Sequence, residues 1–179
     1  MEEAYWKYLE HMDSESFRQL MVTYGQDVWN LAFLMTKRHH LADDITQDVF
    51  LRAYKAIGTF RGASSIRTWL LSITRNISIN YLRTAFVRKV MLTERLSVRE
   101  TSPSAEKVVL AHALSDEIWE AVLRLPLKLR EVLVLHVKYE MTTKEIADAL
   151  RISEGTVKSR LARARRKMSI SWKESAAYE

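Results

Sequence analysis

The scarcity of helix-breaking residues most constrains what this chain can fold into. Its 179 residues contain only four glycines and two prolines, and helix-forming residues dominate between them. Strands and hairpins need frequent turn residues, so little room is left for a sheet. From residue 15 to residue 35, apolar side chains recur mostly every three or four positions, as on the buried face of a helix. They are Phe17, Leu20, Met21, Tyr24, Val28, Leu31 and Leu34. The sequence predicts an all-α fold.

Two small helical domains joined by a linker are expected. The helical pattern weakens after Arg83, and the run from Thr101 to Ser104 is the strongest linker signal. Beyond the first helix, the pattern predicts helices over residues 41–57, 65–83 or beyond, 105–123 and 127–139, with Pro126 separating the last two. The predicted parts are a first domain over 1–83, a linker over 84–105 and a second domain over 106–179.

The second domain ends in a predicted helix-turn-helix over residues 142–168. Thr142 and Glu145 have the spacing of a capping box, and Ser153 can cap the following helix. The turn before Ser153 lacks the glycine often found in this motif. The apolar residues expected to pack between the two helices are Ile146, Ala147, Leu150, Val157, Leu161, Ala164 and Met168.

Positive charge gathers in two separate tracts. Seven basic residues and one acidic residue lie between Arg151 and Lys167, a local charge of +6 that equals the net charge of the whole chain. A second tract over residues 51–100 has ten basic and two acidic residues, and it follows an acidic tract over residues 1–50 with nine acids and four bases. This distribution suggests two nucleic-acid contacts, with acidic surface left for protein partners.

A resemblance to bacterial sigma factors, especially the extracytoplasmic-function group, is carried by two parts of the chain. Their promoter-reading carboxy-terminal domain is similar to LPLKLREVLVLHVKYEMTTKEIADALRISEGTVKSRLARARRKM. Their amino-terminal domain is similar to LADDITQDVFLRAYKAI followed by FRGASSIRTWLLSITRNISINYLR. The two matches cover about residues 14–83 and 106–168, in the order of the family. The resemblance implies a chain that binds core RNA polymerase, directs it to promoters and assists promoter melting.

The resemblance implies three sets of site residues. Contact with the clamp helices of the largest polymerase subunit is implied for Asp44, Gln47, Asp48 and Leu51. At the minus-ten promoter element, a pocket for a flipped base is implied for the loop from Arg61 to Ile66 and for Asn76. Side-chain chemistry suited to single-stranded DNA adds Phe60, Trp69, Asn80 and Arg83 to this set. Contact with the minus-thirty-five element is implied for Lys158, Ser159, Ala162 and Arg163, and the basic surface of the same helix adds Arg160 and Arg166.

Helical geometry agrees with these sets but leaves some positions open. In the segment from Leu41 to Ile57, the implied polymerase contacts share a stripe opposite the apolar one. Trp69 lies on the stripe of Asn76 and Asn80, although an aromatic residue there also fits the core. Asn80 stands where the family is expected to have an aspartate, and Ala162 stands where a bulkier side chain is common. We therefore expect the promoter preference to differ from that of relatives.

Other functions have weaker support. No arrangement of nucleophile, general base or glycine-rich phosphate loop is recognisable, so no enzyme activity or cofactor is expected. His39 and His40 are adjacent rather than spaced to share a metal ion, and no cysteine is present to ligate one. The alternatives are a stand-alone helix-turn-helix regulator that binds operator duplex, and a nucleic-acid-processing enzyme with an appended DNA-binding domain.

The expected partners are core RNA polymerase, promoter DNA and an anti-sigma factor of the kind common in the family. The acidic amino-terminal stretch lacks the features of a signal peptide, and no apolar run approaches the length of a membrane span. The sequence therefore predicts a cytoplasmic protein that is not inserted into a membrane.

Overall fold

The computed structural model describes residues 14–93 and 116–175, which fall into two compact helical units. Every regular element in these ranges is a helix, so the all-α prediction is confirmed. Within the same ranges, no helix is both long enough and apolar enough to cross a bilayer.

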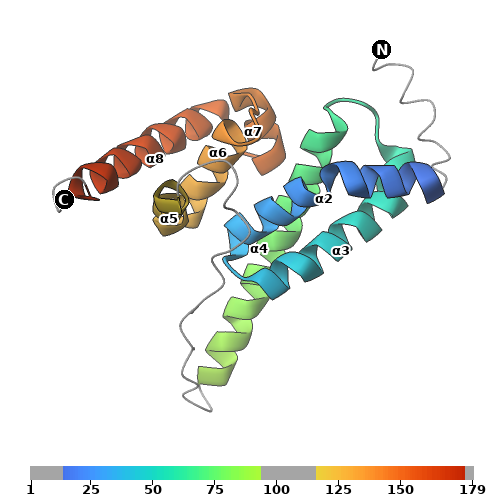
Figure 1. The fold of residues 1–179 in the computed structure, drawn as a ribbon, viewed down its shortest axis with the longest axis horizontal. Coiled ribbons are helices and arrows are strands. Elements are labelled where there is room, and N and C mark those ends of the chain that lie inside the picture. The colour runs from blue at the N-terminus through green and yellow to red at the C-terminus, as the bar shows by residue number, and fades with distance from the viewer. Residues whose placement is uncertain (1–13, 94–115, 176–179) are drawn as a thin grey trace. The chain divides into compact units, whose positions relative to one another are not determined.

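The first unit is built on α2 (Ser14–Thr36), α3 (His39–Ala56) and the part of α4 (Ile66–Thr93) that follows residue 72. Helices α2 and α3 lie side by side (Figure 1). The short 3₁₀ helix η2 (Ile57–Thr59) follows α3 directly and contains the glycine expected to end it.

The apolar stripe predicted for α2 is largely buried, although Phe17 and Tyr24 are half-buried and Met21 is exposed. Leu20, Val28, Leu31 and Leu34 are all buried, whereas Met21 is 38% exposed and contributes little to the core. The prediction was therefore wrong for Met21, and its neighbour Leu20 reaches the core instead.

A polar contact ties α2 to α3 beside this core. The indole Nε1 of Trp29 donates a hydrogen bond of 2.7 Å to the Asp43 carboxylate on α3. The Trp29 ring stacks on Phe33 with 5.5 Å between centroids, and His39 lies against both rings. The contact fixes the start of α3 relative to α2 and therefore the orientation of the acidic face that α3 carries.

Helix α4 runs beyond Arg83, as the sequence left open, so the predicted linker begins too early. It continues past Arg83 to Thr93 and so includes the first part of the segment predicted as a linker. Residues 94–105 of that segment, and the predicted helical turns over 105–115, lie outside the described residues. The start of α4 is capped by Ser65, whose hydroxyl accepts a hydrogen bond of 3.1 Å from the backbone N–H of Thr68.

The second unit contains four described helices that follow residue 115. They are α5 (Asp116–Arg124), α6 (Leu127–Val137), α7 (Thr143–Leu150) and α8 (Glu154–Ser175). Helix α8 packs against α5, α6 and α7. Pro126 separates α5 from α6 as predicted, since it precedes the first residue of α6.

The turn between α5 and α6 is closed by a buried arginine. Arg130 is only 4% exposed, and its Nη1 donates a hydrogen bond of 2.8 Å to the carbonyl oxygen of Leu123. Burial lowers the pKa of the Arg130 guanidinium. An arginine nevertheless stays protonated in proteins, so the contact behaves as a permanent clamp on the end of α5.

Candidate nucleic-acid interface

The helix-turn-helix is formed by α7 and α8, and its caps are those the sequence predicts. The Thr142 hydroxyl accepts from the backbone N–H of Glu145 at 3.2 Å, while the Glu145 carboxylate accepts from the backbone N–H of Thr142 at 2.8 Å. The Ser153 hydroxyl accepts from the N–H of Thr156 at 3.2 Å, just before α8 begins. Thr143 of α7 also donates to Glu154 of α8 at 3.3 Å. Both helices therefore start at defined residues.

The turn between the two helices uses a left-handed residue that is not glycine. Arg151 has φ 54° and ψ 51°, and its N–H bonds back to the end of α7. An L-residue in this conformation costs about 1–2 kcal/mol. Glycine is the residue that usually adopts this conformation at the end of a helix, and Arg151 takes its place here.

The outward face of α8 carries most of the predicted duplex contacts. Lys158, Ser159, Ala162, Arg163 and Arg166 are all exposed. The buried face is equally well defined, since Val157, Leu161 and Ala164 are at most 4% exposed, as predicted. The amino-terminal half of α8 thus presents one hydroxyl and two cations to solvent, in the arrangement that recognition helices place in a major groove.

Arg160 differs from the other predicted contacts. Its Nη1 forms an ion pair of 3.0 Å with the Glu131 carboxylate of α6, and the two side chains are only 15% and 2% exposed. DNA contact by Arg160 stays a prediction, but the sequence did not predict this partner. The sequence did offer a sign that Glu131 has a partner, because this glutamate lies inside the apolar run of α6 and a buried charge needs to be paired. The identity of that partner could not be read from local pattern.

The predicted minus-ten contacts are divided between α4 and the loop before it. Asn76, Asn80 and Arg83 recur along one exposed stripe of α4. Trp69, on the same stripe, is half-buried, in keeping with its double fit to core and DNA. Arg75 donates a hydrogen bond of 3.4 Å to the side-chain oxygen of Asn76.

The loop between η2 and α4 also carries predicted contacts. Phe60 is half-buried and Arg61 is exposed. Gly62 follows with φ 68°, a left-handed conformation that glycine adopts without steric cost. The loop can therefore reverse direction immediately after the two predicted DNA-contacting residues.

The predicted polymerase contacts form one surface on α3, which we call the docking face: Asp44, Gln47, Asp48 and Leu51. Asp44, Gln47 and Leu51 are exposed, and Asp48 is half-buried. Leu51 is 61% exposed and leaves an apolar side chain next to the two carboxylates. The opposite face of α3 is buried, with Ile45 and Val49 at 0% exposure.

A tyrosine from α4 reaches the docking face. The Tyr81 hydroxyl donates a hydrogen bond of 3.0 Å to Oδ2 of Asp48. This bond raises the pKa of Tyr81, and burial and the nearby charge of Asp48 add to the effect. Sequence reasoning missed Tyr81, although it lies one turn after the buried Ile77 on the core side of α4. The sequence could have indicated this contact, because the hydroxyl of a tyrosine on the core side of a helix needs a hydrogen-bond partner.

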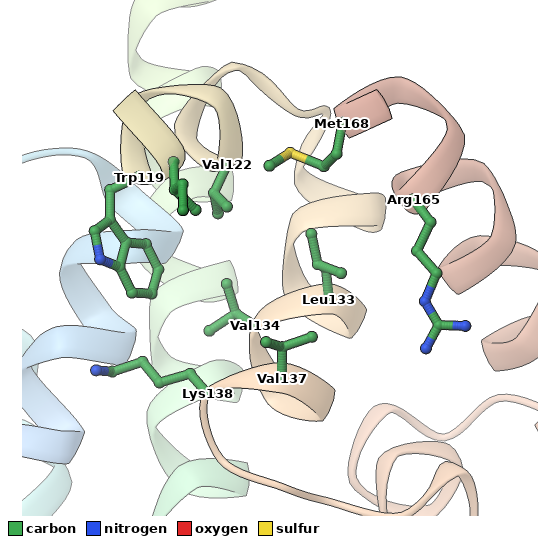
Figure 2. A pocket seen from close by; sticks show the side chains of 9 residues that line it. Trp119, Val122, Leu133, Val134, Val137, Lys138, Arg165 and Met168 are labelled. Atoms are coloured by element: carbon green, nitrogen blue, oxygen red, sulfur yellow. The ribbon is translucent and has the colours of Figure 1, made fainter. Parts of the chain in front are cut away.

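A pocket of about 490 Å³ lies on the second unit between α5, α6 and α8. Figure 2 shows the apolar side chains of Trp119, Val137 and Met168 around it, with Lys138 and Arg165 on opposite sides. The Lys138 ammonium lies 5.4 Å from the centre of the Trp119 ring. Val137 is 62% exposed. The pocket is therefore an apolar surface with cationic edges, apart from the predicted duplex contacts on α8.

Comparison with known families assigns both units. Residues 20–85 match the Sigma-70 region 2 family, and residues 115–168 match the Sigma-70 region 4 family. The first match contains the docking face and the predicted minus-ten residues. The second contains the helix-turn-helix.

Individual relatives cover most of the chain. It is 31% identical over 150 residues to the ECF RNA polymerase sigma factor SigX of Bacillus subtilis, covering 81% of this chain and 77% of the relative. It is 32% identical over 168 residues to SigW of the same organism, covering 89% and 90%. Its fold resembles that of the sigma factor RpoE from Bartonella quintana, solved with the anti-sigma factor NepR, with a TM-score of 0.72, 21% identity and coverage of 89% and 98%. The chain belongs to the extracytoplasmic-function (ECF) family of RNA polymerase sigma factors.

Proposed function

We propose that this chain divides the work of an ECF sigma factor between its two units. The first unit binds core RNA polymerase and the minus-ten element, and the second reads the minus-thirty-five element. One observation carries the proposal: a helix-turn-helix unit and a unit with an acidic, partly apolar docking face occur on one chain, in the order of the family.

Polymerase binds through the docking face of α3. Asp44 and Asp48 supply negative charge, Gln47 supplies an amide and Leu51 supplies an exposed apolar contact. A surface of this kind combines charge attraction during encounter with apolar area buried in the complex. The clamp helices of the largest polymerase subunit are the partner implied by the family resemblance.

Promoter duplex binds to the outward face of α8. Lys158, Ser159 and Arg163 lie in its amino-terminal half and reach base edges or nearby phosphates, while Ala162 leaves room between them. Arg166, one turn further, holds the DNA backbone. Phosphate contacts set position and base contacts set sequence preference, so the two groups of cations have different roles.

Promoter melting is assisted by capture of unpaired bases along α4 and the loop before it. Asn76 and Asn80 offer amides to base edges, Phe60 and Trp69 offer rings for stacking, and the cations of this stretch, Arg61 and Arg83, hold the backbone. A protein that binds unpaired bases more tightly than duplex shifts the equilibrium towards the open state. RNA synthesis belongs to the polymerase, so the chain itself works in the cytoplasm as a non-catalytic initiation factor that needs no cofactor.

The stand-alone regulator is not favoured. It would explain the helix-turn-helix but would leave the docking face and the match to Sigma-70 region 2 without a role. Reconstituted transcription tests the choice directly. Purified core polymerase should initiate at a subset of a promoter library only when the chain is added. Identical transcription with and without the chain on every promoter would reject the sigma function.

Replacing Arg163 by alanine and replacing Arg166 by alanine are expected to impair promoter binding in different ways. Arg163→Ala should reduce discrimination between matched and altered minus-thirty-five sequences by about 1–3 kcal/mol, because a base contact is lost. Arg166→Ala should weaken all sequences alike and reduce the log-log salt slope of binding by about 0.9, because one phosphate contact is lost. Both are measured as promoter binding by the holoenzyme over a range of salt concentrations. Loss of core binding in folded Arg163→Ala, or an unchanged slope in Arg166→Ala, would contradict these roles.

An anti-sigma factor is the third proposed partner, and the apolar pocket of the second unit is its proposed docking site. The similar fold of RpoE was solved with the anti-sigma factor NepR, and that of CnrH with the cytosolic domain of CnrY. The apolar lining and the cationic edges formed by Lys138 and Arg165 suit an amphipathic helix with acidic flanks.

Val137→Glu should weaken binding of an anti-sigma factor from the same organism at least about tenfold, because it places an anion inside an apolar contact. Titration of the full chain with that protein measures the effect. Val22→Glu makes the same change at another exposed valine, on α2, and should leave the affinity unchanged. Equal affinity of the Val137→Glu and unaltered chains would rule out the pocket as the docking site.

A further inference from the structure

We propose that Tyr81 is a positioning residue for polymerase docking, because its hydroxyl holds the Asp48 carboxylate in the orientation that meets the polymerase. The inference rests on the proposed polymerase-binding role of α3. It starts from the 3.0 Å hydrogen bond from the Tyr81 hydroxyl to Oδ2 of Asp48, which joins residues 33 positions apart on different helices.

The surroundings of the hydroxyl support a role on the docking face. Besides Asp48, the charged groups that act on Tyr81 are Asp44 and Arg52, both on α3. The tyrosine therefore reaches from α4 into the charged surface of α3. Its hydrogen bond occupies one carboxylate oxygen of Asp48, and Asp48 itself is half-buried. Such a carboxylate has fewer rotamers to lose when polymerase binds, which lowers the entropic cost of association.

The position of Tyr81 on α4 gives the contact a second consequence. Asn80 precedes it and Arg83 lies two residues further on, and both belong to the exposed stripe proposed to hold the minus-ten element. Tyr81 itself turns towards α3. One short stretch of α4 thus reaches the polymerase-binding face on one side and the promoter-binding stripe on the other.

The affinity of the full chain for purified core polymerase tests the proposal. Tyr81→Phe keeps the ring and removes only the hydroxyl, and we expect binding to weaken by about three- to tenfold. Asp48→Asn should weaken binding by itself. Adding Tyr81→Phe to the Asp48→Asn chain should cause little further loss, since the hydroxyl then has no docking carboxylate to orient. Binding of unpaired minus-ten DNA by the holoenzyme, measured at saturating polymerase, should be the same for Tyr81→Phe as for the unaltered chain.

Thr84→Val is the matched control. Thr84 lies one turn after Asn80 on α4, and its hydroxyl bonds to the Asn80 carbonyl oxygen rather than to α3. Removing that hydroxyl should leave polymerase affinity unchanged. An equal loss from Tyr81→Phe in both Asp48 backgrounds would indicate a general structural role and overturn the proposal, as would full affinity of the single variant. Failure of the unaltered chain to bind polymerase would instead overturn the polymerase-binding function on which the proposal rests. No effect of Asp48→Asn would overturn the role of Asp48 in docking, and the proposal with it.

Discussion

Transcription from a matched promoter is expected to fall to the level of core polymerase alone when Asp48 is replaced by arginine. The substitution removes a carboxylate from the centre of the docking face and puts a cation beside the exposed Leu51. It also removes the acceptor of the Tyr81 hydrogen bond. Loss of one partner of a charged interface contact costs about 2–5 kcal/mol, so core affinity should fall by about thirtyfold to several thousandfold.

Two measurements separate this effect from misfolding and from loss of DNA binding. The affinity of the Asp48→Arg chain for polymerase should be strongly reduced. Its helical circular dichroism should be retained, since Asp48 is only half-buried. Asp148→Arg makes the same charge reversal at an exposed residue of α7 and should preserve polymerase binding. An Asp48→Arg chain that still competes fully for core polymerase would show that α3 is not the docking helix.

Arg160→Met is expected to have the largest effect on stability, lowering the free energy of unfolding of the second unit by about 2–3 kcal/mol. Methionine keeps much of the apolar stem of arginine but cannot pair with Glu131. That carboxylate is 2% exposed, so solvation replaces the lost charged donor only poorly. Urea unfolding followed by circular dichroism measures the change. Arg166→Met, at an exposed arginine of the same helix, should change stability by less than about 0.5 kcal/mol.

A double-mutant cycle decides whether the loss comes from the ion pair. Glu131→Gln and Arg160→Met are measured separately and together. If the two side chains stabilise each other, the combined loss should be smaller than the sum by more than about 1 kcal/mol. Strict additivity would mean that Arg160 stabilises α8 through its packing alone. It would also leave Arg160 open to the DNA contact that the sequence suggested.

Much of the helical pattern was predictable because it depends on neighbours three or four residues away. The capping box of Thr142 and Glu145 and the cap at Ser153 follow from such spacing. The same spacing predicts that Val157 is buried on α8 and that Arg163 is exposed on the same helix. The end of α4 was not predictable in the same way, because no proline or glycine marks the stretch from Arg83 to Thr93. Where no residue type stops a helix, its last residue depends on how far tertiary packing outweighs fraying of the helix end.

The candidate site was predictable as a set of faces but not as a set of contacts. Helical period places Asp44, Gln47 and Leu51 on one side of α3, and the structure has them exposed there. Helical period cannot predict that the Asp48 carboxylate accepts a hydrogen bond from a tyrosine on another helix. Likewise, the helical period places Arg160 at the edge of the DNA-facing surface of α8. In the structure, its side chain instead turns inward to Glu131.

The amino-acid sequence by itself determined the helical class, the caps, the buried and exposed faces and the two basic tracts. Each of these depends on residue type and on spacing within one or two helical turns. Only the tertiary structure decided the partners of Asp48 and Arg160, which lie 33 and 29 positions away in the chain. Those pairings depend on how separate helices pack, and a charged or hydroxyl side chain on a helix edge can turn towards solvent or core until that packing is known.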